Sequence, residues 1–208
     1  MINNYKDSNF IYFSCDVETY YDDNKQKIRK KLNMPKNWSV LEKSKYNKSK
    51  NGLAIITGRK SNLFVIDYDD KELFKQDTKL FPELKNYFVK SKNGFHCYFK
   101  WSDTAKHLTS TTQPVDFQGD GKCVLAPPTI YHYKDKTYKY TLKADNDLQP
   151  VSTTLFAYLS NKYITVEKTV KKIVEKTVER PVERPVEKSV EKQNEFIQLG
   201  NIINISYL

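Results

Sequence analysis

Two aspartates stand where an apolar run ends, in the stretch LFVIDYDD at residues 63–70. Side chains alternate along a strand, so Asp67 and Asp69 point to one face while Tyr68 points to the other. Two carboxylates on one face of a strand end can converge on divalent cations. The same acids are equally typical of a strand that has reached solvent. The pair alone therefore leaves both interpretations open.

A histidine follows in the segment KSKNGFHCYF at residues 90–99. The Asn-Gly pair at 93–94 is a strong signal for a tight turn between two strands. This hairpin would present His96 just past a turn that carries Lys90 and Lys92. A lone strand histidine is usually structural, but the adjacent cations favour an anionic ligand.

A third acid lies in the stretch VDFQGDG at residues 115–121. Val115 and Phe117 are expected to face the core, so Asp116 faces away from them. The next apolar run, 122–126, is followed by two prolines, which stop a strand because neither can donate a ladder hydrogen bond. Four chemically useful side chains, Asp67, Asp69, His96 and Asp116, thus fall on three different predicted strands.

Composition favours a polyanionic partner. The 208 residues carry a formal net charge of +10 and a pI near 9.3, and residues 1–165 hold 27 basic against 18 acidic residues. Such an excess suits nucleic acid but does not prove it. Three cysteines without a Cys-x-x-Cys pair indicate a reducing compartment rather than a disulfide framework or zinc ribbon. With no apolar signal core or membrane-spanning run, the sequence predicts a soluble intracellular protein.

The elements that must position these residues are mostly strands. The patterns predict an α+β fold built on mostly antiparallel sheets with flanking helices. Strands are predicted at 10–15, 53–57, 63–69, 87–91, 95–101, 114–118, 122–126 and 137–142, and helices at 24–32, 71–77 and 151–159.

The composition changes sharply near residue 165. Valine then recurs every four residues in a V-E-K/R repeat, which drifts around a 3.6-residue helix, and Pro181 and Pro185 forbid a continuous helix. We therefore expect a folded domain at 1–163, a charged linker at 164–193 and a short apolar tail at 194–208.

Taken in order, these motifs resemble the primase–polymerase (prim-pol) domain of the archaeo-eukaryotic primase superfamily, in its viral and plasmid form. That family carries a D-x-D or D-x-E at the end of an apolar strand, a Gly-x-His in a hairpin, and an apolar-Asp pair on a third strand. The run VLAPPT at 124–129 adds to the resemblance, which spans about residues 38–142.

The resemblance implies the primase catalytic fold, with an RRM-like unit plus a second α/β unit, and metal-dependent, template-directed nucleotidyl transfer in DNA replication. Two Mg²⁺ or Mn²⁺ ions would be held by Asp67, Asp69 and Asp116, and His96 would bind the phosphates of the incoming NTP or dNTP. Single-stranded DNA would be the template. Charge and position alone nominate four further phosphate contacts: Lys90, Lys92, Arg59 and Lys60.

Other acids and other functions stay open. Asp70 and Asp120 are expected in solvated loops. The stretch CDVET at 15–19 resembles the first motif of DEDD-type 3′–5′ exonucleases, which would use Asp16 and Glu18, although a surface turn is the simpler expectation for both. A non-catalytic single-stranded DNA-binding module is the third possibility. No phosphate-loop motif is present, so the chain has no helicase motor of its own. We expect the V-E-K/R repeat to be a solvated tether; the alternative, by analogy with relatives, is a route to a replicative helicase through the tail.

Overall fold

The computed structural model describes residues 5, 8–108 and 114–164. The chain divides into two compact units, Met1–Thr165 and Val166–Leu208, and all described residues belong to the first. The predicted linker at 164–193 and tail at 194–208 lie outside the described residues, apart from Ile164.

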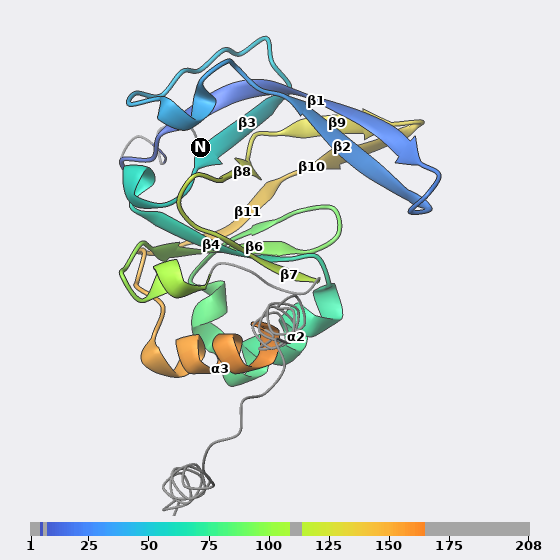
Figure 1. The fold of residues 1–208 in the computed structure, drawn as a ribbon. Helices are drawn as coiled ribbons and strands as arrows, with labels where there is room; N and C mark the ends of the chain where they lie inside the picture. Colours follow the sequence, from blue (N-terminus) through green and yellow to red (C-terminus); the bar gives the residue numbers. More distant parts are fainter. Residues whose placement is uncertain (1–4, 6–7, 109–113, 165–208) are drawn as a thin grey trace, which may run out of the picture. The chain divides into compact units, whose positions relative to one another are not determined.

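Two antiparallel sheets and two α-helices make up the described unit, which confirms the α+β class (Figure 1). The five-stranded sheet has the order β11-β5-β6-β4-β7 and the four-stranded sheet the order β2-β1-β3-β8, while β9 and β10 form a hairpin. The strands are β1 (Tyr12–Asp22), β2 (Lys27–Asn33), β3 (Gly52–Ile56), β4 (Leu63–Tyr68), β5 (Tyr87–Lys90), β6 (Phe95–Lys100), β7 (Val115–Gln118), β8 (Cys123–Ala126), β9 (Ile130–Tyr133), β10 (Lys136–Lys139) and β11 (Thr141–Asp145). The helices are α2 (Lys71–Leu80) and α3 (Thr153–Tyr163), with short 3-10 turns η1 (Trp38–Val40), η2 (Arg59–Ser61), η3 (Pro82–Lys85) and η4 (Ala105–His107).

The five-stranded sheet separates two hydrophobic cores. Along β4, Leu63 and Val65 enter the core that lies between the two sheets. Phe64 and Ile66 enter the second core, which α2 and α3 cover from the other side (Figure 1). Alternate residues of β4 pack in opposite cores, so the packing determines which face of the sheet each side chain of β4 occupies.

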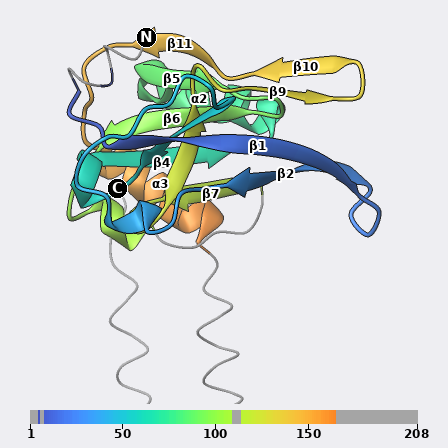
Figure 2. The same cartoon turned by 90° about the horizontal axis from the view of Figure 1, so that it is seen from above.

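The predicted helix at 24–32 is wrong. Residues Lys27–Asn33 form β2, which pairs antiparallel with β1. In KIRKKLN the apolar residues Ile28 and Leu32 are four positions apart, a spacing that fits one face of a strand as well as one face of a helix. The β1–β2 hairpin contacts the β9–β10 hairpin, since the Thr19 hydroxyl donates to the carbonyl of His132 at 2.5 Å (Figure 2).

The observed strands differ from the predicted ones in three smaller ways. The sequence patterns missed β9, and the strand predicted at 137–142 is broken at Tyr140 into β10 and β11. Asp16 and Glu18 lie within β1 rather than on a surface turn, because β1 continues to Asp22 as one arm of the hairpin.

A buried carboxylate of α2 connects α3 to β4. Asp77 of α2 is fully buried and accepts hydrogen bonds from the hydroxyls of Tyr68 (3.0 Å), Tyr158 (2.7 Å) and Tyr163 (2.7 Å). The Lys162 ammonium donates a fourth at 2.7 Å. Burial by itself raises the pKa of Asp77, but the four donors outweigh it and hold that pKa below its usual value.

We expect Asp77→Asn to lower the free energy of unfolding by roughly 3 kcal/mol, because it removes one partner of a buried ion pair. Chemical denaturation at pH 7 measures this. The folded-state pKa is depressed, so the contribution is present above the unfolded-state pKa of about 4 and is lost as the pH falls through the folded value. The gap between wild type and variant should therefore shrink below about pH 4.

Glu72→Gln on the same helix is the matched control. Glu72 pairs with Lys75 at 2.7 Å, but both side chains are largely exposed. Its loss should cost less than about 1 kcal/mol. Equal destabilisation by the two substitutions would contradict the role assigned to the Asp77 cluster.

Candidate functional site

Strand order brings Asp67 between two of the predicted site residues. β4 lies between β6 and β7, and Asp67 is directly opposite His96 on one neighbour and Asp116 on the other. The His96 Nε2 is 3.3 Å from the Asp67 Oδ1. All three residues occupy the sheet face that looks toward β8 and β2, since their neighbours along each strand enter the core under the helices.

Asp69 joins this group from just beyond the strand. Its backbone N–H donates to the carbonyl of Pro114 at 2.8 Å, which holds the chain beside β7 after the β4 ladder has ended. Asp69, Asp67 and His96 line one pocket between the two sheets. The other residues that line it are Lys30, Leu32, Ser91, Gln118, Cys123, Val124, Leu125 and Tyr140.

The electrostatics of the site favour a cation. Burial raises the pKa of Asp67, the facing His96 opposes this, and the nearby carboxylates of Asp69 and Asp116 raise it further. Burial lowers the pKa of His96, against the attraction of Asp67, and so favours a neutral imidazole. A carboxylate that is desolvated and has two like-charged neighbours is stabilised when a positive ion is bound.

Asp116 lies in register with Asp67, but its carboxylate has other partners. The Oδ2 accepts from Gln118 Nε2 at 2.7 Å, and the Oδ1 lies 3.5 Å from Lys122 Nζ. Within the described ranges no three His, Cys, Asp or Glu side chains are arranged to hold a metal ion. Carboxylate oxygens are the kind of ligand that Mg²⁺ or Mn²⁺ prefers, but Asp116 would have to exchange Lys122 and Gln118 for an ion before it could join Asp67 and Asp69.

The four basic residues predicted to contact phosphate lie in different parts of the fold. Lys92 lies in the β5–β6 turn and lines a pocket with Asp69. Lys90 is exposed at the end of β5. Arg59 and Lys60 belong to η2, which precedes β4 and so lies at the end of that strand remote from Asp67.

Arg59 and Lys60 have local contacts in the structure. The backbone N–H of Arg59 donates to Asp120 Oδ1 at 2.7 Å, and the guanidinium lies 3.7 Å from the same carboxylate. Lys60 Nζ donates to the carbonyl of Ser39 at 2.9 Å. The structure therefore brings Lys92 to the acids and does not bring Arg59 or Lys60 there.

The remaining acids have structural partners. Asp70 is the N-cap of α2, where its side chain accepts from the backbone N–H groups of residues 72 and 73. Asp16 pairs with Lys50 at 2.6 Å, and Glu18 accepts from Asn33 at 2.5 Å. Neither Asp16 nor Glu18 lines the pocket of Asp67.

The sequence patterns did not predict two residues that line the pocket, Lys30 and Tyr140. Lys30 reaches the pocket from β2, and its Nζ donates to the hydroxyl of Tyr140 at 2.6 Å. The Tyr140 ring lies 5.4 Å from the imidazole of His96, centroid to centroid. The spacing of Ile28 and Leu32 was the available signal for Lys30, because in a strand Lys30 lies on the same face as both.

Gly94 allows the β5–β6 turn to lie close to the backbone of Tyr68 and Asp69. Its N–H donates to Ser91 Oγ at 3.1 Å, and its carbonyl accepts from the Ser91 N–H at 2.9 Å. A Cβ at this position would overlap the carbonyl of Tyr68 and crowd the Cα of Asp69. Only glycine therefore allows the turn to pack against the end of β4.

The chain matches one family model, Prim-Pol, described as "Bifunctional DNA primase/polymerase, N-terminal", over residues 18–153. That region contains all three aspartates, His96 and Lys30. A search among curated proteins gave no match. Across the part of the chain described, no helix has the length and apolar character that a membrane crossing requires.

We expect Gly94→Ala to displace the backbone of Tyr68 and Asp69 and to lower the free energy of unfolding by roughly 1–3 kcal/mol, as overpacking does. Thermal or urea unfolding measures it. Gly119→Ala is the matched control, because a Cβ there meets only the Trp101 ring at 3.4 Å. The control should range from neutral to a gain of about 1 kcal/mol. A Gly94→Ala protein as stable as this control would refute the close approach.

Proposed function

Because the chain belongs to the Prim-Pol family of bifunctional DNA primase/polymerases, we propose that it catalyses metal-dependent, template-directed nucleotidyl transfer at the site around Asp67. Family membership supports a DNA primase/polymerase type of function in general. The assignment of this chemistry to particular residues is our proposal. It rests chiefly on one observation, the register that sets Asp67 between His96 and Asp116.

The proposed reaction joins a nucleotide to a DNA or RNA 3′ end. The 3′-hydroxyl oxygen forms a bond to the α-phosphorus of the incoming NTP or dNTP, and its proton passes to solvent. The bond from that phosphorus to the bridging oxygen breaks, and pyrophosphate leaves with the electron pair. Asp67, Asp69 and Asp116 would hold Mg²⁺ or Mn²⁺. When bound, such ions supply Lewis-acid stabilisation of the attacking and leaving oxygens.

The protein side chains have separate tasks in this scheme. Asp67 and Asp69 supply the carboxylates of the pocket, whose lining also contains one lysine, Lys30. His96 is buried, and its Nε2 lies 3.3 Å from Asp67 Oδ1. A neutral imidazole has a single N–H, which would donate to a phosphate oxygen in place of that carboxylate. The single-stranded DNA template would bind the basic surface through its phosphates.

The proposal extends to partners only by analogy. NTP or dNTP and single-stranded DNA are the proposed substrates, and a replicative helicase reached through residues 164–208 is a further hypothesis. Those residues, apart from Ile164, lie outside the described ones, so the helicase hypothesis rests on the resemblance alone.

Primer extension tests the proposed reaction. The double substitution Asp67→Asn with Asp69→Asn should reduce incorporation of labelled nucleotide at least about 100-fold, because it removes the charge that would hold the metal ions. Asp16→Asn with Glu18→Gln is the control, and it should leave extension unchanged. Both pairs exchange two acids of one strand region for isosteric amides.

The same assay separates the other functions. Template degradation that disappears in the Asp16/Glu18 variant would indicate an exonuclease and overturn the proposal. If the protein binds DNA but incorporates no nucleotide, and the Asp67 substitution does not change the DNA affinity, the protein is a non-catalytic DNA-binding module.

Metal binding can be measured without turnover. Titration of Mn²⁺ followed by electron paramagnetic resonance should show at least about tenfold weaker binding for Asp67→Asn than for wild type, because a central carboxylate ligand is lost. EDTA should abolish extension, and added Mg²⁺ or Mn²⁺ should restore it. Wild-type Mn²⁺ affinity in Asp67→Asn would argue against this carboxylate as a ligand.

A further inference from the structure

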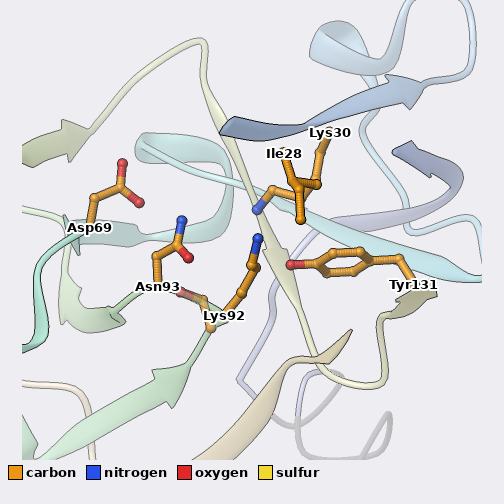
Figure 3. Close-up of a pocket in the computed structure, with 7 residues that line it drawn as sticks. Ile28, Lys30, Asp69, Lys92, Asn93 and Tyr131 are labelled. Carbon is orange, nitrogen blue, oxygen red and sulfur yellow. The ribbon is translucent and has the colours of Figure 1, made fainter. Parts of the chain in front are cut away.

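Two lysines from different sheets point at one another across a small pocket. Lys30 comes from β2 of the four-stranded sheet, and Lys92 comes from the turn between β5 and β6. Figure 3 shows their amine ends directed toward each other, with Asn93 and Asp69 on one side and Tyr131 on the other. The two groups thus lie in one space beside the acids of the proposed active site.

Neither ammonium group is neutralised by an acid. Within the described ranges no Asp or Glu forms an ion pair with Lys30 or Lys92. Lys30 instead donates to the hydroxyl of Tyr140, and Lys92 Nζ lies 4.8 Å from the centroid of the Tyr138 ring. Burial lowers the pKa of Lys92, and the positive charges of Lys30 and Lys136 lower it further. The two ammonium groups repel each other. Asp69 lines the same pocket and Asp67 attracts Lys30 at longer range, and an anion between the two amines would reduce their repulsion further.

The neighbours of this pair specify the kind of anion. Lys30 also lines the adjoining pocket with Asp67, Asp69 and His96, so the two pockets share Lys30 and Asp69. An anion between the lysines therefore lies next to the carboxylates that would hold metal ions. A polyphosphate fits a site that has ammonium groups beside a metal ion, because some of its oxygens can accept from the lysines while others bind a divalent cation.

We propose that Lys30 and Lys92 form a two-lysine clamp for the terminal phosphates of the incoming nucleoside triphosphate, with the β1–β2 hairpin supplying the wall opposite Asp69. The inference rests on the proposed function for the identity of the nucleotide. Its new element is Lys30, a residue of the other sheet, which makes the phosphate site a two-sided one.

Tyr140 is the positioning residue for this clamp. It is 4% exposed, its hydroxyl is 2.6 Å from Lys30 Nζ, and its ring packs near His96. A rigid, buried phenol of this kind fixes the amine of a long flexible side chain at the pocket. It also links Lys30 to His96, the residue proposed to contact phosphate from the other sheet.

Binding of inorganic pyrophosphate in the presence of Mg²⁺, measured by calorimetry, tests the clamp without turnover. Lys30→Met keeps the aliphatic stem and should weaken binding about 10- to 100-fold, the usual range for a charge-assisted hydrogen bond. Lys31→Met is the matched control, one residue along β2 on the exposed outer face, and should bind pyrophosphate like wild type. Tyr140→Phe should fall between the two.

Steady-state extension and DNA anisotropy complete the test. Lys30→Met should raise the KM for nucleotide about 10-fold or more, with the affinity for single-stranded DNA and the melting temperature unchanged. Equal effects of Lys30→Met and Lys31→Met, or lost DNA affinity with an unchanged KM, would overturn the clamp. If pyrophosphate binding depends on Lys30 while wild type incorporates no nucleotide, the proposed function fails and the anion site stands.

Discussion

The antiparallel register of β4 with its two neighbours is the constraint on which the site depends. It sets Asp67 opposite both His96 and Asp116, residues 29 and 49 positions further along the chain. A slip of one residue in either pairing would send the partner side chain to the opposite face of the sheet. The core under the helices prevents such a slip of β7, because Val115 and Phe117 would leave that core and the Asp116 carboxylate would be buried in it.

The site is built by both sheets, although the acids come from one. The five-stranded sheet supplies Asp67, His96 and the turn that carries Lys92, whereas β8 and β2 form the facing wall. Lys30 reaches across from that wall and Tyr140 fixes it there. Opposite charges therefore meet between the sheets, and the hydrophobic core behind them holds the sheets together. A small rotation of β2 would change the distance between cation and acid without altering any strand of the acid-bearing sheet.

Alternation along single strands was enough to predict the faces of Asp67, His96 and Asp116, since each is flanked by residues of the opposite core. The order of strands was not readable in this way, because it is decided by pairings between segments far apart in sequence. The same limit hid Lys30. A basic, polar stretch such as KIRKKLN has weak local preference, and only its pairing with β1 makes it a strand. Tyr140 escaped because it lies at a break between two strands, where no periodicity identifies a residue.

The buried Asp77 bears on where this domain ends. The family match stops at residue 153, the first residue of α3. Yet three of the four donors to Asp77, namely Tyr158, Lys162 and Tyr163, come from beyond that point. A truncation at residue 153 would leave the buried Asp77 carboxylate with one of its four donors, Tyr68 of β4. The smallest autonomous fragment must therefore run through residue 163, ten residues past the boundary that family resemblance alone would draw.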